Sequence, residues 1–276
     1  MLAPLFDGAL MSESATTQST LLTIRCSWAL RWSLRAFLVL IAMIAIGMGW
    51  ISYQMRMGQM HDRIAKRIST QGAVVRWKLE RQVPVQHSPG IAGVNFASAF
   101  VKQKGGPDWM KRLGAESAFQ RIEYIYFRGH SAKQLDALLE EIEPLGRLKG
   151  FSTDGVPVSE AQVERILNTL EIESLGISET SIGRRPMPFL RDSKLTWLSF
   201  HRTQLSDVAL DDLPETLTYF DATRTRITDE GLPKFARLKN LNTLILRRTP
   251  TSREAIEKLQ SEMPWCEIRW APLTKP

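Results

Sequence analysis

Residues 195–269 repeat one pattern, and this repeat limits the possible fold more than any other feature of the sequence. The copies read Leu195-x-x-Leu198-x-Phe200-x-x-Thr203, Leu217-x-x-Phe220-x-Ala222-x-x-Thr225 and Leu241-x-x-Leu244-x-Leu246-x-x-Thr249, with a shortened copy at Ile268. An apolar strand, a small polar residue at a fixed offset and an amphipathic segment, recurring about every 22–24 residues, predict a stacked solenoid. One such unit cannot bury its own apolar face, so neighbouring units must form the core together.

The same register extends upstream of residue 195. The first core residues of the predicted strands lie 26, 24, 23, 22, 24 and 24 residues apart, at Ile125, Phe151, Leu175, Leu198, Phe220, Leu244 and Ile268. Alternate residues of a strand point to opposite faces, so one face forms the core and the other faces outward. We therefore predict an α/β fold: a curved solenoid over residues 121–276, with one parallel strand and one helix per repeat.

Polar residues at fixed places in the units support this prediction. Helical segments are expected at residues 132–145, 159–170, 206–213, 228–238 and 252–263, and Ser159, Ser206, Thr228 and Ser252 stand where a helix N-cap would lie. The segment 184–188 is the exception, because its prolines prevent a regular helix. A column formed by Thr180, Thr203, Thr225 and Thr249 is expected to place hydroxyls against the turn backbone, the alternative being independent surface threonines.

The most complete copy is Leu217-x-x-Phe220-x-Ala222-x-x-Thr225-x-Ile227-Thr228-Asp229-x-Gly231-Leu232. It resembles the leucine-rich-repeat superfamily, specifically its ribonuclease-inhibitor-like and cysteine-containing types. Residues 195–210 are similar to the same motif, segments 122–151 and 148–175 are degenerate copies, and the resemblance covers residues 120–270. It implies a curved solenoid used for protein recognition, and it implies neither catalysis nor a particular ligand.

An apolar segment precedes the repeats. Residues 36–53 carry no charge, and as a helix they would be about 27 Å long, close to the hydrocarbon thickness of a bilayer. Trp32, Trp50 and Tyr53 lie where interfacial aromatic residues belong. We predict an uncleaved single-pass transmembrane helix at residues 31–56, the alternatives being a signal peptide cut near Gly47 and a buried core helix. Basic residues flank both ends. Their balance weakly favours a cytoplasmic C-terminal side, and the short N-terminal tail favours the opposite, so the orientation stays open. With this span, the layout resembles bacterial single-pass membrane-anchored proteins with leucine-rich repeats.

The remaining boundaries follow from composition. Residues 1–30, rich in Ser and Thr, are predicted to be a disordered tail. Residues 57–120 are predicted to form a juxtamembrane helix (part of residues 54–70), a strand at 72–79, an irregular insertion at 80–106 and a short helix starting at Pro107. A helix and strand ahead of the first repeat are expected to act as an N-terminal cap, because the end of a solenoid otherwise exposes its core.

Composition argues against several function classes. The formal net charge is +7, but residues 1–120 hold 14 Lys/Arg and 6 Asp/Glu, so the remaining 22 basic and 23 acidic residues leave the repeats near neutral. A nucleic-acid partner would need a basic face on the folded domain, and we expect none. Cys26 and Cys266 have no metal or disulfide-framework spacing. No phosphate-binding, dinucleotide-binding or HExxH motif occurs, so we expect no cofactor, no metal and no enzymatic activity.

The outward strand positions give the candidate binding surface. Tyr, Trp and Arg dominate the energetic hot spots of protein interfaces, and the register brings such residues together on neighbouring strands. The predicted partner-binding residues are Trp197, His201, Arg202, Tyr219, Asp221, Arg224 and Arg247. The alternative is an ordinary solvated sheet face with Arg–Asp pairs worth less than ~1 kcal/mol each.

Two functions fit these features. The first is a non-enzymatic, membrane-anchored protein that recognises another protein or a cell-surface ligand through the concave strand face. Its contact with the lipid bilayer would be made by residues 36–53. The second is a soluble-type adaptor, the substrate-recognition subunit of a larger complex. Residues 1–30 or 80–106 would then have to dock the other subunits, and neither carries a docking motif.

Overall fold

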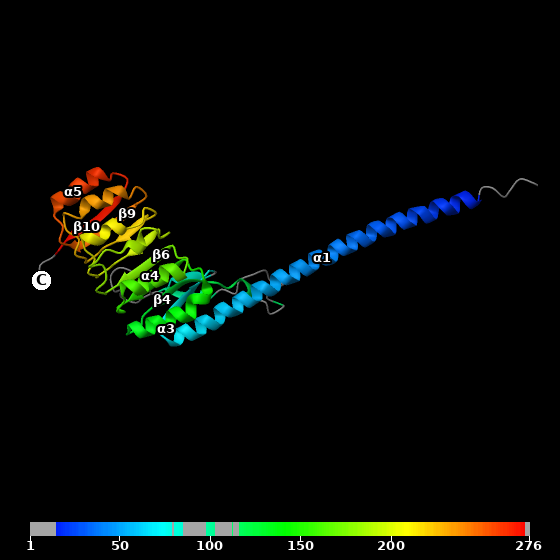
Figure 1. Cartoon of the computed structure of the whole chain (residues 1–276), viewed down its shortest axis with the longest axis horizontal. Helices are drawn as coiled ribbons and strands as arrows, with labels where there is room; N and C mark the ends of the chain where they lie inside the picture. Colours follow the sequence, from blue (N-terminus) through cyan, green and yellow to red (C-terminus); the bar gives the residue numbers. More distant parts are fainter. Residues whose placement is uncertain (1–14, 79, 85–97, 103–111, 113–115, 274–276) are drawn as a thin grey trace, which may run out of the picture. The chain divides into compact units, whose positions relative to one another are not determined.

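The computed structural model describes residues 15–78, 80–84, 98–102, 112 and 116–273. The chain divides into two compact units, Met1–Gln54 and Met55–Pro276. The second unit contains an eight-stranded sheet in the order β1-β4-β5-β6-β7-β8-β9-β10 (Figure 1). Its strands are β1 (Ala73–Trp77), β4 (Ile122–Phe127), β5 (Gly150–Asp154), β6 (Ser174–Ser178), β7 (Trp197–Ser199), β8 (Tyr219–Asp221), β9 (Thr243–Thr249) and β10 (Glu267–Pro272).

The predicted register is confirmed. Strands β4 to β10 are all parallel, and each core position pairs with the core position of the next unit, from Ile125 with Phe151 through to Leu244 with Ile268. From Ile125 to Leu244 these residues are at most 1% exposed. Burying such a side chain contributes about 1.5–3 kcal/mol. Ile268 is only partly buried because β10 is the last strand of the sheet.

Helices and 3-10 turns cover the other side of the strands. They are α3 (Ala132–Ile142), η2 (Glu143–Leu145), α4 (Glu160–Thr169), η3 (Pro188–Leu190), η4 (Asp207–Asp212), η5 (Leu232–Arg237) and α5 (Arg253–Glu262). The helices expected at 206–213 and 228–238 are therefore wrong, because both segments form 3-10 turns. Pro233 lies inside η5 and Pro214 follows η4. A proline has no amide donor and clashes with the preceding turn of a helix, so Pro233 excludes the expected helix that would begin at Thr228 and contain it. Pro214 disfavours a helical conformation of Leu213 and so keeps η4 from continuing.

Two of the four predicted N-caps are confirmed. The Ser159 side chain accepts a hydrogen bond from the Gln162 amide in a capping box, and Ser252 accepts one from the Ala255 amide. Ser206 and Thr228 do not cap helices. The Ser206 hydroxyl donates to the carbonyl of Gly183, and the Thr228 hydroxyl donates to Asp207. Both hydroxyls link neighbouring repeats, because no α-helix follows them.

The threonine column contacts the turn backbone as predicted. The hydroxyls of Thr203, Thr225 and Thr249 are buried and donate to the carbonyl three residues earlier, at 3.0, 2.8 and 3.0 Å. Each bond satisfies a carbonyl at the sharp bend that ends a strand. Because a buried carbonyl without a partner is destabilising, these threonines are part of the fold and not of a binding surface.

The first repeat is capped by β1 and by the C-terminal part of α1 (Ala15–Thr70). β1 pairs antiparallel with β4, and Ile64 and Ile68 of α1 are buried in the shared core. His61 is 3% exposed, and its Nδ1 accepts the Ile122 amide hydrogen at 3.1 Å. This bond ties the helix directly to the first parallel strand.

Residues 15–30, predicted to be disordered, continue α1 as helix. Residues 15–46 contain no Pro and no Gly, so nothing in the sequence interrupts the helix before Gly47. The insertion at 80–106, predicted to be irregular, contains β2 (Glu80–Pro84) and β3 (Ser98–Lys102), which pair antiparallel as a separate two-stranded sheet. The short helix predicted from Pro107 lies almost entirely outside the described residues.

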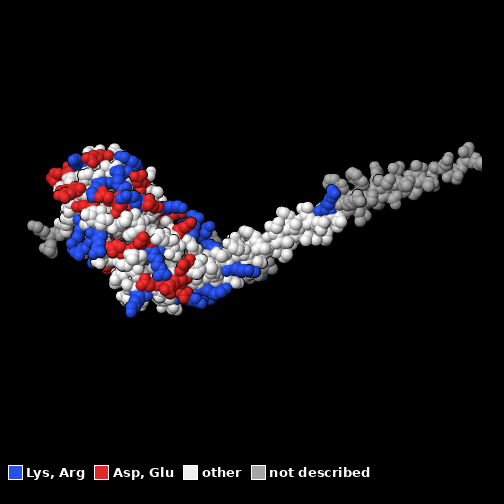
Figure 2. All heavy atoms as spheres, in the orientation of Figure 1, with Lys and Arg blue, Asp and Glu red and all other residues white. Residues whose placement is uncertain are grey.

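Helix α1 is long and apolar enough to cross a membrane. Within Ser33–Thr70, its most apolar 18-residue window has a mean hydropathy of 2.2, and none of that window is buried. Side chains such as Val39, Met43 and Ile46 are 63%, 64% and 69% exposed, and residues 36–53 form an uncharged surface (Figure 2). A signal sequence near an N-terminus meets the same criteria of length and composition.

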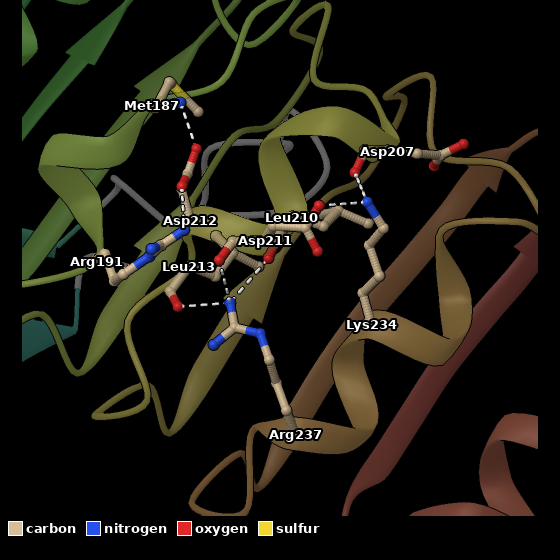
Figure 3. Close-up of polar contacts among 9 residues, drawn as sticks. All are labelled: Met187, Arg191, Asp207, Leu210, Asp211, Asp212, Leu213, Lys234 and Arg237. Atoms are coloured by element: carbon tan, nitrogen blue, oxygen red, sulfur yellow. Dashed lines mark hydrogen bonds and ion pairs between the residues drawn. The ribbon is translucent and has the colours of Figure 1, made fainter.

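A polar network connects the covering segments of neighbouring repeats (Figure 3). Asp212, 4% exposed, accepts the Met187 amide at 2.7 Å and the Arg191 guanidinium at 2.9 Å. Arg237 donates to three carbonyl oxygens at the end of η4, those of Leu210, Asp211 and Leu213. These bonds satisfy backbone groups that a 3-10 turn leaves free, so the network is structural.

We expect Asp212→Ala to lower the free energy of unfolding by about 3 kcal/mol, because it leaves a buried amide and a guanidinium without their acceptor. The neighbouring substitution Asp211→Ala is the control, since it removes only an exposed ion pair with Lys234 and is expected to change stability by less than ~1 kcal/mol. Chemical unfolding of the full chain in a mild detergent measures both. Equal effects would contradict the structural role of Asp212.

The buried His61 makes stability depend on pH. Burial, and next the nearby Arg121, lower the pKa of His61 from 6.5 to about 4, while Asp62 acts in the opposite direction. The unfolded chain therefore binds this proton more readily than the folded chain. His61 therefore leaves the free energy of unfolding unaffected above about pH 6.5. As the pH drops toward 4, this residue lowers the free energy of unfolding, by roughly 2 kcal/mol between pH 7 and 4.5.

We expect His61→Asn to remove this part of the pH dependence, because the asparagine oxygen can accept the Ile122 amide but does not titrate in this range. Unfolding of both proteins at pH 7 and pH 4.5 gives the comparison, and all other titrating groups cancel in the difference. If the two proteins lose the same stability on acidification, His61 is not the responsible group.

Candidate functional site

The register arranges the outward side chains in rows that cross the sheet, and we call this surface the strand face. In one row the neighbours are Tyr124, Gly150, Ser174, Trp197, Tyr219, Thr243 and Glu267. In the next they are Tyr126, Ser152, Gly176, Ser199, Asp221, Ile245 and Arg269. Small residues on β5 and β6 thus lie between aromatic residues on β4 and on β7–β8.

Trp197 and Tyr219 form the centre of the site. Their rings stack with centroids 5.2 Å apart and planes 8° from parallel, and both side chains are partly exposed. Such a pair contributes about 0.5–1.5 kcal/mol beyond the area it buries. At the β4 end of the same row, Tyr124 lies over Gly150, where an added Cβ would come within 2.6 Å of the ring. The strand face therefore offers rigid aromatic groups that need no further ordering.

Charged groups surround the Tyr219 hydroxyl. Burial, and next the Asp221 carboxylate, raise the pKa of Tyr219, while Arg269 and Arg247 act in the opposite direction. The phenol therefore stays protonated and can donate a hydrogen bond. Asp221 also accepts the Thr223 amide at 2.8 Å, so one of its oxygens supports the turn. Because Asp221 is negative and Arg247 and Arg269 are positive, the site can bind partner groups of either charge.

In several units, the residue four positions after the core residue of the strand has a left-handed backbone. Glu179, Arg202, Arg224 and Arg248 have φ between 55° and 59°, and Gly155 holds the same place in the β5 unit with φ 67°. The amides of four of these residues donate to a carbonyl of the next unit, as Arg224 does to Arg247 at 2.8 Å; the other three are Gly155, Glu179 and Arg202. The bond explains the conformation. It does not explain why glutamate or arginine stands there, because these side chains cost about 1–2 kcal/mol in this conformation relative to glycine.

The structure brings together some of the predicted site residues. Trp197 stacks on Tyr219, and Asp221 and Arg247 both act electrostatically on Tyr219. Arg202 forms an ion pair with Glu179 of the preceding unit. For Arg224, Arg247 and His201, the described residues include no side-chain hydrogen-bond or ion-pair partner, and His201 is not bonded to Asp221. The site is thus an aromatic centre with arginines beside it.

The sequence prediction missed Arg269. It lies on β10 beside Ile245, forms two hydrogen bonds with Glu267 at 2.8 and 3.0 Å, and acts electrostatically on Tyr219. Extending the register by one unit, from Asp221 through Ile245, would have found it. The shortened last repeat concealed this position.

Other parts of the described chain offer less chemistry. They contain no group of three or more His, Cys, Asp or Glu residues that could hold a metal ion. Cys266 is buried, and burial, followed by Glu267, raises the pKa of its thiol to about 11, so it is a poor nucleophile near neutral pH. A cavity of about 620 Å³ lies between α1 and α3, where Met60 and Ile64 meet an exposed ion pair of Arg67 with Glu141.

The class of protein follows from the strand register and this surface: a leucine-rich-repeat-like solenoid with one parallel strand per unit and an outward strand face. No protein-family model matches the chain, and no curated protein matches it. Twelve chains of solved structure match. One is an internalin of Listeria monocytogenes, 19% identical over 55% of this chain and 44% of the internalin, with a TM-score of 0.39. The chain thus spans less than half of that protein.

Stacking of Trp197 on Tyr219 can be tested by a double-mutant cycle. We expect Trp197→Ala and Tyr219→Ala to be less than additive in their effect on unfolding, with a coupling energy of about 1 kcal/mol. Trp197→Ala combined with Tyr124→Ala serves as the control, because two strands separate these rings. A coupling near zero for the first pair would contradict the stacked arrangement.

Proposed function

We propose that this chain is a non-enzymatic, membrane-anchored protein that recognises a protein partner through the concave strand face of its repeats. The observation that carries the proposal is the stacked, partly exposed Trp197–Tyr219 pair with arginines beside it. A soluble domain gains little stability from leaving large aromatic rings in contact with water. In an interface, such rings provide contact area and lose little conformational freedom on binding.

The anchor in this proposal is the segment 36–53. Its length and hydropathy support a single span, with Arg56, Arg63, Lys66 and Arg67 following it on α1. Basic residues just outside a bilayer add about 1 kcal/mol each when anionic lipids are present. The span would hold the repeats near a surface and raise their local concentration toward partners on the same membrane. Recovery of the full chain in the soluble fraction would instead favour the adaptor function.

The binding role is tested by Trp197→Ala combined with Arg224→Ala in the full chain. We expect affinity for partners to fall by at least about 100-fold, because both residues are of the types that dominate interface energies. Loss of the stacking is expected to lower unfolding stability by only about 1 kcal/mol. Quantitative pull-down from detergent extracts of the native cell provides the measurement.

The matched control is Trp265→Ala with Arg184→Ala. It removes the same two residue types from exposed positions of the same domain that are not part of the strand face. Proteins captured by the unchanged chain and by the control, but lost with the first pair, are the partners we expect. If both pairs retain the same proteins, the strand face around Trp197 is not the binding surface.

A further inference from the structure

Three consecutive repeats place an arginine at the same left-handed position, and we call Arg202, Arg224 and Arg248 the arginine column. The pairing of Leu198 with Phe220 and of Phe220 with Leu244 puts these residues on adjacent units. Adjacent strands are about 4.8 Å apart, so three guanidinium groups start from a line about 10 Å long. Like charges at this spacing repel one another unless a counter-charge is present.

Counter-charge within the chain is incomplete. Arg202 pairs with Glu179, which holds the same left-handed position in the preceding unit. Among the described residues, Arg224 and Arg248 have no side-chain hydrogen bond or ion pair, and both are exposed. Arg247, also exposed, stands directly before Arg248 and adds a further positive charge at the same end of the strand face. Two members of the column, Arg224 and Arg248, and the neighbouring Arg247 therefore carry positive charge with no ion-pair partner among the described residues.

The fold itself does not call for arginine here. The unit of β5 fills the same position with Gly155, which makes the same amide bond to the following unit without strain. Asparagine is the other residue that tolerates this conformation well. Strained positions that persist in a structure point to a use of the side chain outside the fold. The side chains of the arginine column are therefore candidates for binding an anion.

We infer that the arginine column binds an acidic, extended segment of the protein partner, a step that rests on the function proposed above. Carboxylates match the guanidinium fork. Alternate side chains of an extended chain point to the same face about 6.6 Å apart, so acidic groups at every second residue come within reach of long arginine side chains whose backbones are about 4.8 Å apart.

The surroundings favour an acidic peptide over other polyanions. The repeats carry 22 basic and 23 acidic residues from residue 121 on, and charges of both signs are interspersed over the domain in Figure 2. Nucleic acid binding depends on many phosphate contacts over a broadly basic surface. Glu179 and Asp221 next to the column would repel a uniform phosphate backbone, whereas a peptide can place neutral or basic residues beside them.

The test uses the full chain in nanodiscs of zwitterionic lipid and a fluorescent decapeptide of alternating Glu and Ser. We expect measurable binding at low ionic strength that weakens with salt, and at least a tenfold loss in Arg224→Gly with Arg248→Gly. Glycine suits the left-handed backbone, so the midpoint of thermal unfolding is expected to stay unchanged or rise. Loss of affinity without loss of stability separates a binding role from a structural one.

Arg184→Ala with Arg185→Ala is the control of equal charge, because both residues are exposed and lie outside the column. It is expected to change peptide affinity by less than about twofold. Equal loss in the two double variants, or no loss in the glycine variant, would overturn the inference. So would tighter binding of a single-stranded oligonucleotide or of anionic lipid vesicles to the same arginines.

Failure of this inference is distinguishable from failure of the proposed function. If the glycine variant keeps its affinity for the peptide while Trp197→Ala with Arg224→Ala still loses the captured proteins, recognition by the strand face stands and the acidic ligand is wrong. If the glycine variant loses the peptide but the captured proteins are unaffected by Trp197→Ala with Arg224→Ala, the column binds acidic chains and the aromatic centre is not the recognition surface.

Discussion

The in-register pairing of one parallel strand per unit is the interaction on which the rest of this structure depends. Each core side chain from Ile125 to Leu244 is covered by the equivalent side chain of the next unit, and the strand backbones share hydrogen bonds along the same line. A unit removed from this stack would expose an apolar residue on each side. Stability is therefore a property of neighbouring pairs, which explains why the first strand needs the cap made by β1 and α1.

The turns after the strands strengthen the same coupling. Left-handed residues donate their amides to the following unit, and buried threonine hydroxyls satisfy carbonyls within the turn. The covering segments add Asp212 and Arg237, whose partners also lie in the neighbouring unit. Because backbone groups and a few buried side chains carry these contacts, most residues of the strand face are left free to vary. A recognition surface can change there without disturbing the core.

Periodic features of the sequence were predictable, and features without a period were not. The core positions and the threonine column recur at a fixed offset, so each repeat gives independent support for the same predicted strand and turn. The 3-10 turns η4 and η5 depend on where a proline falls in one unit, and the contacts of Ser206 and Thr228 depend on which element follows them. Asp212 has no equivalent elsewhere, and only the folded chain shows that it is buried.

The candidate site divides in the same way. Strand register alone places Trp197 beside Tyr219, but it does not reveal that Arg202 is paired with Glu179 or that four charged residues share a strained backbone conformation. The same turn position holds glycine in one unit and arginine in three others. The backbone conformation and the choice of side chain therefore have different causes at this position. The backbone sets the conformation, and glycine would satisfy it at lower free energy. Arg202 has its counter-charge in Glu179, whereas Arg224 and Arg248 hold the same conformation without a counter-charge among the described residues, and this difference is the basis for the acidic ligand inferred above.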